Sequence, residues 1–293
     1  MSKEITGTTM LTGLLGSPVS HSISPAMHNE AFKLLDLDYV YLAFDVSNDD
    51  LETAVNGLRA LNVRGFNLTM PFKNKICSLC DEISPVAKMT GSVNTVVHKN
   101  GILSGHTTDG IGFMRSVTEH GFNIIGKKMT ILGAGGAASS IVAQAAFDGV
   151  LEISIFNHHS SSFIHMENMI RNLQLCTNCK FHLYDYSDPC ILKKEIQESA
   201  ILVNATPVGM SPDINSSIIV DPHMFHEHLI VTDIIYHPKK TKLLQLAEKA
   251  GCPSFNGLSM LLYQGAEAFR LWTGREMPVS DLRKKISNFN LKE

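Results

Sequence analysis

The sequence predicts an α/β protein with two domains and mainly parallel sheets. Its 293 residues exceed the usual size of one domain. Strand-like and helix-like segments alternate almost throughout, which is typical of layered α/β folds. A glycine-rich loop at residues 133–138 follows an apolar strand and restarts this alternation in the second half.

The first half predicts strands at residues 11–16, 39–46 and 63–70, and helices at residues 24–35 and 49–62. Residues 93–105 predict a hairpin, because Asn100-Gly101 suits the tight turn between two antiparallel strands. The boundary between the domains is expected near residues 109–121, where one helix is expected to join the two halves.

The second half predicts a strand, a glycine turn and a helix over residues 127–150. Further strands are expected at residues 151–157, 179–186, 201–207 and 229–236, and further helices at residues 165–174, 241–251 and 257–274. The order of these segments is that of a second parallel sheet with crossover helices.

Composition argues against several classes of protein. A net charge of −3 gives no electrostatic footprint for nucleic acid. The first residues contain no apolar segment typical of a signal peptide, so a cytoplasmic protein is expected. Residues 129–147 carry no charge, but their glycines, serines and Gln144 fit a buried strand and helix better than a membrane span.

The cysteines do not predict a metal site. Two CxxC pairs, Cys77/Cys80 and Cys176/Cys179, lie far apart in the sequence and fall in different predicted domains. Structural zinc sites usually bring such pairs into one small module, and no HExxH spacing is present. Reduced thiols and no bound metal are therefore expected.

The sequence GAGGAA, residues 133–138, predicts a dinucleotide-binding loop, because it directly follows a strand and opens a helix. Gly133 permits the tight turn, Gly135 lets the backbone approach a pyrophosphate, and Ala138 is the small residue where helix and strand pack closely. The helix start then offers N–H groups to the anion. The alternative is a glycine turn kept only for packing.

The end of the next strand normally selects the cofactor, with an acidic residue for NAD and an arginine for NADP. Here the sequence is NHHSSS, residues 157–162, which offers neither. His158, His159 and the serines suit a phosphate, but the histidines equally suit adenine or water. The choice between NAD and NADP stays open.

Lys73 breaks the local rules of its segment, GFNLTMPFK. Asn67 and Thr69 are two apart on a predicted strand and so share a face. Pro71 is expected to open a helix, which places Lys73 in the first turn, where a cation is disfavoured. Such breaks are typical of functional sites. The alternative is an ordinary solvated lysine.

Other polar residues complete a candidate site. Ser22 and Ser24, in an expected extended lead-in, suit a carboxylate, although Ser24 alone would equally serve as a helix cap. Asn94 and Asp109 each fit ordinary turn or cap positions. Beside Asp109, however, Lys73 would be kept protonated and could exchange a proton with an alkoxide as hydride reaches a ketone.

Seven motifs in order resemble the shikimate dehydrogenases, especially their quinate/shikimate dehydrogenase branch: HSISP, GFNLTMPFK, GSVNTV, TTDGIGF, GAGGAA, NATPVGM and MLLYQGAEAF. The resemblance covers nearly the whole chain. It implies reversible reduction of 3-dehydroshikimate to shikimate with a nicotinamide cofactor, in aromatic amino acid biosynthesis.

The resemblance also implies roles for individual residues. Lys73 would transfer the proton and Asp109 would be its partner, while Ser22 and Ser24 would hold the substrate carboxylate. The rest of the substrate pocket would comprise Asn67, Thr69, Asn94, Tyr236 and Gln264. The cofactor would contact Gly133, Ala134, Gly135, Gly136, Ala137, Asn157, His158, His159, Ser160, Ile234 and Gly257.

The fold implied by the resemblance is an N-terminal α/β substrate domain plus a Rossmann dinucleotide-binding domain, with C-terminal helices returning to the first domain. The implied boundaries are residues 1–110 and 258–293 for the substrate domain and 111–257 for the NAD(P)-binding domain. A cleft between the two domains would hold the reactants.

One departure concerns the cofactor, since NADP-dependent members carry an NRT-like stretch where this chain has NHH. NAD, NADP and quinate therefore all remain open, as does a homodimer. The alternatives are a dehydrogenase of another small polyol acid, a nucleotide-sensing protein without turnover, and a zinc-dependent alcohol dehydrogenase.

Overall fold

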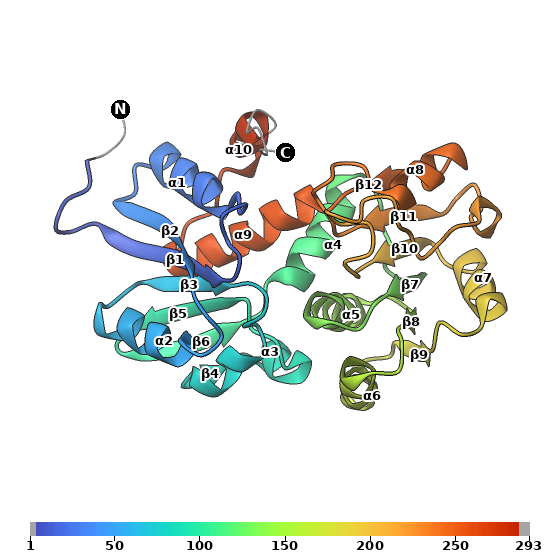
Figure 1. Ribbon diagram of the computed structural model, residues 1–293, viewed down its shortest axis with the longest axis horizontal. Helices are drawn as coiled ribbons and strands as arrows, with labels where there is room; N and C mark the ends of the chain where they lie inside the picture. Colours follow the sequence, from blue (N-terminus) through green and yellow to red (C-terminus); the bar gives the residue numbers. More distant parts are fainter. Residues whose placement is uncertain (1–3, 287–293) are drawn as a thin grey trace. The chain divides into compact units, whose positions relative to one another are not determined.

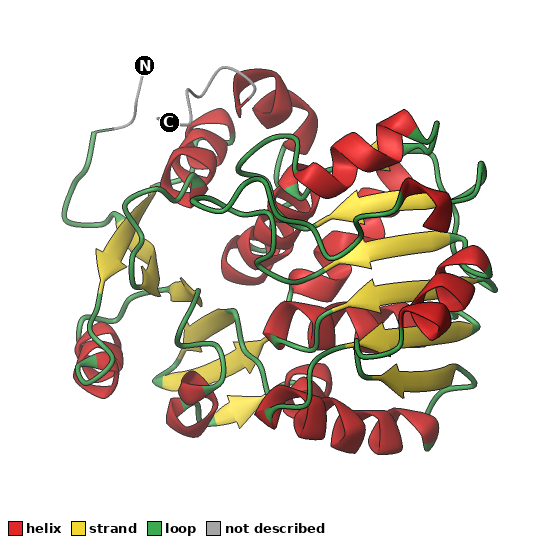
Figure 2. Cartoon of the chain, turned by 45° about the vertical axis from the view of Figure 1, so that its right-hand side comes forward, coloured by secondary structure: helices red, strands yellow, loops and turns green. Residues whose placement is uncertain are grey.

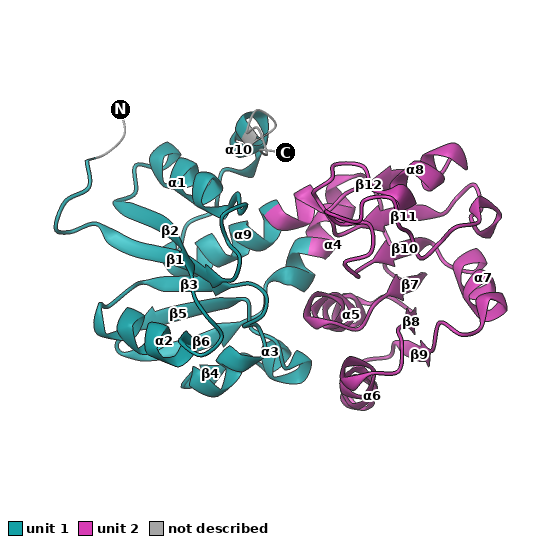
Figure 3. Ribbon diagram, in the orientation of Figure 1, with its two compact units in different colours: residues 1–112, 262–293 teal, residues 113–261 magenta. Residues whose placement is uncertain are grey.

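A computed structural model describes residues 4–286. The chain forms two compact units, residues 1–112 with 262–293 and residues 113–261 (Figure 3). Two helices, α4 (Asp109–Glu119) and α9 (Leu258–Thr273), each contribute residues to both units. The predicted α/β class is confirmed, and residues 262–293 belong to the same unit as the N-terminal sheet.

The first unit contains a six-stranded mixed sheet with the order β2-β1-β3-β5-β6-β4 (Figure 1). The three strands β2, β1 and β3 are parallel, whereas β5 runs antiparallel to both of its neighbours. The strand bounds are β1 (Met10–Gly16), β2 (Tyr39–Asp45), β3 (Gly65–Leu68), β4 (Glu82–Ile83), β5 (Thr95–Lys99) and β6 (Ile102–His106). The expected hairpin is present as β5 and β6, and both residues of its turn, Asn100 and Gly101, have positive φ.

The helices of this unit are α1 (Ser24–Leu34), α2 (Leu51–Ala60), α3 (Pro85–Thr90), α10 (Val279–Ile286), the 3₁₀ helix η1 (Lys75–Leu79) and the C-terminal part of α9. Strand β3 shows how the sheet is covered, because its side chains alternate between two faces. Phe66 and Leu68 join an apolar core with the buried face of α2. Gly65 and Asn67 therefore point to the opposite face.

Gly65 makes room for Trp272 of α9. A Cβ atom at Gly65 would lie 2.3 Å from the indole nitrogen of Trp272. That nitrogen donates a hydrogen bond to the Val96 carbonyl at 3.0 Å, and the indole is fully buried. The missing side chain at position 65 therefore lets α9 lie directly against the sheet.

His28 of α1 is buried in the same aromatic layer. Its ring stacks on Tyr41 with 4.4 Å between centroids and also lies near Phe269 and Trp272. Neither ring nitrogen has a hydrogen-bond partner in the described structure. Burial lowers the pKa of His28 from 6.5 to about 3, because the charged form cannot be solvated there.

We expect His28 to make the fold acid-sensitive. Below pH 6.5 the unfolded chain binds a proton at this residue, whereas the folded chain does not until about pH 3. Stability is therefore lost as the pH falls, by about 2 kcal/mol at pH 5 for this residue alone. The free energy of unfolding, measured with urea at pH 7 and at pH 5, should fall less between the two pH values for His28→Met than for the wild type. Equal losses for both proteins would contradict this expectation.

The second unit contains a six-stranded sheet with the order β12-β11-β10-β7-β8-β9, and all paired strands are parallel. Its strands are β7 (Lys128–Leu132), β8 (Glu152–Phe156), β9 (Lys180–Tyr184), β10 (Ile201–Asn204), β11 (Ile230–Asp233) and β12 (Ser254–Phe255). Counted within the unit, this is the 3-2-1-4-5-6 order of dinucleotide-binding folds.

Helices cover both faces of this parallel sheet (Figure 2). They are α5 (Gly136–Asp148), α6 (Ser161–Gln174), α7 (Pro189–Gln197) and α8 (Lys242–Lys249), with the short 3₁₀ helix η2 (Pro222–Met224) and the N-terminal part of α9. The apolar residues of α7 and α8 form one core with Leu132, Leu202 and Val231 of the sheet. In such sheets, ligands bind at the carboxyl ends of the strands where the strand order reverses, here between β7 and β10.

All six cysteines are free thiols. Within residues 4–286, no helix is long and apolar enough to cross a membrane. The uncharged residues 129–147 form β7, the glycine turn and most of α5, as predicted.

Candidate active site

Lys73 and Asp109 form an ion pair in the first unit. The Lys73 Nζ lies 2.6 Å from Asp109 Oδ2. The side chain of Asp109 is only 7% exposed and that of Lys73 is 21% exposed, so the amine lies at the edge of the buried network. Asp109 is the first residue of α4, where the helix N-terminus also stabilises a negative charge.

The local structure around Lys73 differs from the sequence prediction. No helix begins at Pro71; Lys73 lies in a turn, and η1 begins only at Lys75. The Lys73 carbonyl accepts a hydrogen bond from the Val93 N–H at 2.8 Å, and the Cys77 N–H, which an α-helix would direct to Lys73, bonds to the Asn74 carbonyl instead. Phe72 is fully buried beside it, and these two anchors fix the direction of the lysine.

Asn94 orients Asp109. Its side-chain amide donates to Asp109 Oδ1 at 2.8 Å and to Thr108 Oγ1 at 2.9 Å. Its side-chain oxygen, Oδ1, accepts a hydrogen bond from the Thr108 N–H at 2.8 Å. A longer contact of 3.3 Å joins the Asn94 amide to Gln264 Oε1 on α9. Asp109 is therefore held at one oxygen by Asn94 and at the other by Lys73.

Asn67 extends this network across the sheet. Its side-chain nitrogen, Nδ2, donates to the backbone carbonyl of Asn94 and to Thr95 Oγ1, both at 3.0 Å. Its carbonyl oxygen accepts from the Tyr41 hydroxyl at 2.8 Å. Thr69, two residues further on, is half-buried, and its N–H bonds to the Leu15 carbonyl. The structure thus connects Lys73, Asp109, Asn94, Asn67 and Gln264 through described contacts.

Ser22 and Ser24 lie at the start of α1. The lead-in is not extended as expected, because Ile23 has helical dihedral angles and the Ser22 N–H bonds to the Val19 carbonyl. Ser24 is the first residue of the helix and its hydroxyl is not a cap. Instead, Ser22 Oγ accepts from the Ser24 N–H at 3.3 Å.

The glycine loop follows β7 in the second unit. Gly133 has a φ of +108°, and a Cβ there would lie 2.9 Å from the Ala205 carbonyl oxygen and 2.9 Å from Thr206 Cγ2. A Cβ at Gly135 would meet no protein atom within 4 Å, so packing does not explain that glycine. Helix α5 begins at Gly136 with no side-chain cap. Ala134 is buried and Ala137 half-buried beside these glycines.

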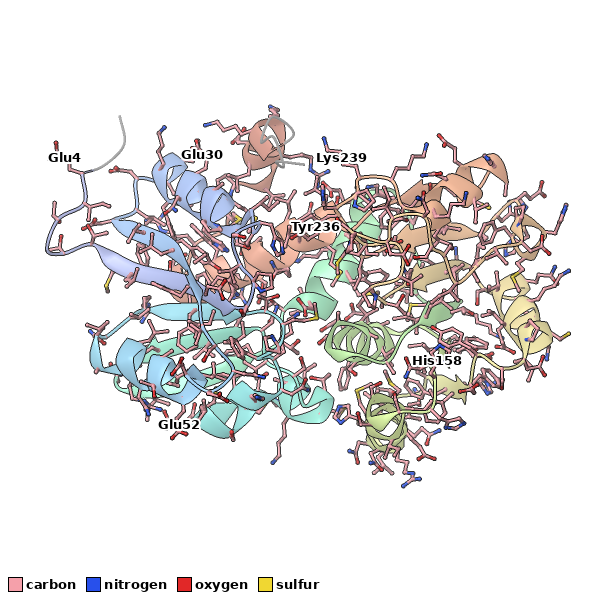
Figure 4. The ribbon with its side chains drawn as sticks, in the orientation of Figure 1. Glu4, Glu30, Glu52, His158, Tyr236 and Lys239 are labelled. Atoms are coloured by element: carbon pink, nitrogen blue, oxygen red, sulfur yellow. The ribbon has the colours of Figure 1, made fainter. Side chains whose placement is uncertain are left out.

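The segment between β8 and α6 carries the expected adenosine-side residues, and Figure 4 labels His158 there. Asn157 Nδ2 donates to Ser160 Oγ and Ser162 Oγ, both at 3.2 Å. His158 is exposed and its ring lies 4.8 Å from that of Tyr186. The N–H of His159 donates to Asp185 Oδ2 at 3.1 Å. Hydroxyl and imidazole groups thus gather in one loop.

The ends of β10 and β11 carry a buried carboxylate that the sequence did not single out. Asp233 accepts hydrogen bonds from Asn204 Nδ2 at 3.1 Å, from the Ile235 N–H at 3.0 Å and from Thr241 Oγ1 at 2.7 Å. Burial raises the pKa of Asp233 to about 6, against the effect of these donors. Asp233 therefore fastens the segment that contains Tyr236.

Tyr236 is half-buried in this segment (Figure 4), and burial raises its pKa. Ile234 and Gly257, expected together near the nicotinamide, are in direct contact. The Gly257 N–H donates to the Ile235 carbonyl, and a Cβ at Gly257 would lie 1.9 Å from the Ile234 carbonyl oxygen. Only glycine fits there.

Sequence reasoning missed Tyr41, Thr95, Thr108, Asn204 and Asp233. Thr95, Thr108 and Asn204 lie within the quoted motifs GSVNTV, TTDGIGF and NATPVGM, so the motifs themselves were the signal. Tyr41 lies outside these motifs and gives no such signal. Within residues 4–286, no group of three or more His, Cys, Asp or Glu residues is arranged to hold a metal ion.

A doubly wound sheet with a glycine loop at its switch point defines a dinucleotide-binding α/β protein. Comparison with known proteins identifies the family. Residues 14–96 match the shikimate dehydrogenase substrate binding domain, and residues 257–286 match the shikimate 5'-dehydrogenase C-terminal domain. A shikimate dehydrogenase (NADP(+)) of Listeria innocua is 50% identical over 284 residues, which cover 97% of this chain and 98% of the relative.

Solved structures agree. The crystal structure of shikimate 5-dehydrogenase from Listeria monocytogenes, in complex with shikimate and NAD, matches with a TM-score of 0.92 and 50% identity. The match covers 98% of this chain and 99% of that one. Quinate dehydrogenase from Corynebacterium glutamicum, in complex with NAD, matches with a TM-score of 0.85, 30% identity and coverage of 95% and 99%. The chain belongs to the shikimate dehydrogenase family of NAD(P)-dependent oxidoreductases.

Proposed function

We propose that the chain catalyses the reversible, NAD(P)-dependent reduction of 3-dehydroshikimate to shikimate. The observation that carries this proposal is the Lys73–Asp109 ion pair, held by Asn94, in a chain of this family. When bound, the nicotinamide supplies the hydride that reduces the ketone. Lys73 then gives its proton to the developing alkoxide, and takes it back in the oxidation of shikimate.

Asp109 has two tasks in this mechanism. One of its oxygens forms the ion pair with the Lys73 amine at 2.6 Å, and its second oxygen, held by Asn94, fixes the direction of the pair. Ser22 and Ser24 bind the substrate carboxylate, while Asn67, Thr69, Asn94, Tyr236 and Gln264 bind the remainder of the substrate. The first unit, which contains all of these residues except Tyr236, thus serves as the substrate domain.

The second unit serves as the NAD(P)-binding domain. The residues that would hold the pyrophosphate fit this group, because Gly133 needs its positive φ, Gly135 has open space in place of a side chain, and α5 begins uncapped. N–H groups at a helix start stabilise phosphate. The Asn157–Ser160 segment would meet the adenosine end, and Ile234 with Gly257 would meet the nicotinamide.

Initial rates test the proposed function and its specificity together. Shikimate and quinate are each assayed with NAD⁺ and with NADP⁺, and the four kcat/KM values are compared. Turnover of shikimate with at least one cofactor is the expected result. Turnover of neither substrate would contradict the proposal and favour the nucleotide-sensing alternative. Dominant turnover of quinate with NAD⁺ would replace shikimate as the substrate.

We also propose that the chain acts in the cytoplasm as a homodimer. Sedimentation of the purified chain gives its mass in solution and decides the oligomeric state.

A further inference from the structure

Asp233 is a buried carboxylate for which the proposed mechanism gives no role. It is the last residue of β11 and is fully buried. Its Oδ1 accepts from Asn204 Nδ2 at 3.1 Å and from the Ile235 N–H at 3.0 Å, whereas its Oδ2 accepts from Thr241 Oγ1 at 2.7 Å. Burying a carboxylate costs free energy unless donors surround it. The fold supplies these donors from three separate segments.

Asp233 lies at the edge of the sheet where the cofactor is expected. Strands β10 and β11 are parallel, with Asn204 opposite Asp233, so both side chains lie at the carboxyl ends of their strands. Ligands of doubly wound sheets bind at this edge, with one mononucleotide on each side of the point where the strand order reverses. The loop after β8 is on the adenosine side, so β10 and β11 are on the nicotinamide side.

The Oδ1 atom of Asp233 fixes the backbone that follows β11. It holds the Ile235 N–H, while the Ile235 carbonyl accepts from the Gly257 N–H at 3.0 Å. The Ile234 N–H donates to the Asn204 backbone carbonyl at 3.0 Å. Without Oδ1, the Ile235 N–H loses its partner, and one of the bonds that orient this segment is gone.

The glycine loop is held independently of Asp233. Asn204 Oδ1 accepts from the Thr206 N–H at 3.1 Å and from Thr206 Oγ1 at 2.7 Å. Asn204 Nδ2 also donates to the Val208 carbonyl at 3.2 Å. These bonds keep Thr206 against Gly133, where Thr206 Cγ2 lies 2.9 Å from the position of a Cβ. A change at Asp233 should therefore leave the glycine loop in place.

We propose that Asp233 is a positioning residue for the nicotinamide ring, because its Oδ1 fixes the backbone of Ile234 and Ile235, against which the ring lies. Asp233 itself is fully buried and does not touch the cofactor. This inference rests on the proposed function. It assigns Asp233 to the orientation of the ring for hydride transfer, and it leaves cofactor affinity to the glycine loop.

The test compares Asp233→Ala with Asp233→Asn. Asparagine can keep all three contacts, because its oxygen accepts from Asn204 and Ile235 while its amide donates to the Thr241 hydroxyl. Alanine keeps none of them. Asp233→Ser is a second disruptive variant, whose short hydroxyl can accept from the nearest N–H only. It decides the question if the alanine variant does not fold.

The first measurement needs no turnover. The fluorescence lifetime of bound reduced cofactor, NADH or NADPH, lengthens when the nicotinamide ring is immobilised. In Asp233→Ala the lifetime should shorten towards that of the free cofactor, whereas Asp233→Asn should keep the wild-type value. The Kd from the same titration should rise by no more than about threefold in either variant, because the glycine loop is unchanged.

The second measurement is the single-turnover rate constant for reduction of 3-dehydroshikimate by enzyme saturated with reduced cofactor. A displacement of the reacting atoms by about 1 Å costs about 10²-fold, so Asp233→Ala should lower this rate constant at least about tenfold. Asp233→Asn should stay within about twofold of the wild type. A first-order rate constant does not depend on the fraction of folded enzyme, so a loss of stability alone would not change it.

Thr241→Val is the matched control. The Thr241 hydroxyl bonds only Oδ2 of Asp233, and it accepts from the Leu244 N–H at 3.5 Å as the N-cap of α8. The variant loses this cap and should be less stable. It keeps both contacts of Oδ1, so the fluorescence lifetime and the single-turnover rate constant should stay at the wild-type values.

Three results would overturn the proposal: a wild-type lifetime and rate constant in the disruptive variants, equal losses in Asp233→Ala and Asp233→Asn, or the same loss in Thr241→Val. Equal losses with asparagine would mean that the charge of Asp233 matters and not its geometry. Turnover by the wild type is measured first. Its absence would refute the proposed function, whereas an active wild type with unaffected variants would refute only the role of Asp233.

Discussion

Replacing Lys73 with alanine is expected to lower kcat for shikimate oxidation by about 10²–10⁴-fold, the usual contribution of a general acid or base. The variant loses the only proton carrier that the described network presents beside Asp109. Cofactor affinity should not change, because the glycine loop belongs to the other unit. Steady-state rates and titration of NADPH fluorescence measure the two quantities.

Lys75→Ala is the control for this substitution. Lys75 lies two residues further on, is exposed, and bonds Asn48 at 2.8 Å. It carries the same charge, so a general electrostatic effect on the substrate would appear in both variants. Wild-type rates in Lys73→Ala, or equal losses in both variants, would show that Lys73 is not the proton donor.

A Gly133→Val substitution is expected to destroy cofactor binding while the first unit stays folded. The φ of +108° is strained for any side chain, and the new Cβ would lie 2.9 Å from the Ala205 carbonyl oxygen. Strain of this kind costs about 1–3 kcal/mol even without the collision. The loop must therefore move, and the Kd for NADPH, measured by fluorescence titration, should rise at least about tenfold.

Gly126→Ala is the control that separates backbone strain at a positive φ from the position of the residue in the glycine loop. Gly126 also has a left-handed φ, of +71°, but a Cβ there would meet no atom within 4 Å. It precedes β7 and lies outside the glycine loop. This variant should keep the wild-type Kd, and a similar loss of affinity in both variants would mean that general strain, and not the position of the loop, limits cofactor binding.

The sequence was informative where chemistry and local structure coincide. Gly133 and Gly135 directly follow a strand, and Lys73 and Asp109 lie in recognisable motifs. The neighbouring sequence was therefore enough to predict them as site residues. The same local reading failed at Pro71, because the Lys73 carbonyl bonds to Val93, twenty residues away. No local pattern around Lys73 records that bond.

Tyr41 was missed for a related reason. It meets Asn67 only because the sheet places β1 between β2 and β3, and the two residues are 26 positions apart. Strand order is a property of the whole sheet, and a strand such as YVYLAF is compatible with many orders. Asp233 was missed because an aspartate at the end of a strand is common in sequences. Only the folded structure shows that this one is buried and accepts hydrogen bonds from three donors.

The contact between Gly65 and Trp272 restricts how this family can diverge. The indole occupies the volume that a side chain at position 65 would need, and its nitrogen bonds to Val96. A relative with alanine or a larger residue at 65 must therefore carry a smaller residue at 272. The residues at these two positions should therefore covary among relatives, although more than two hundred residues separate them in the sequence.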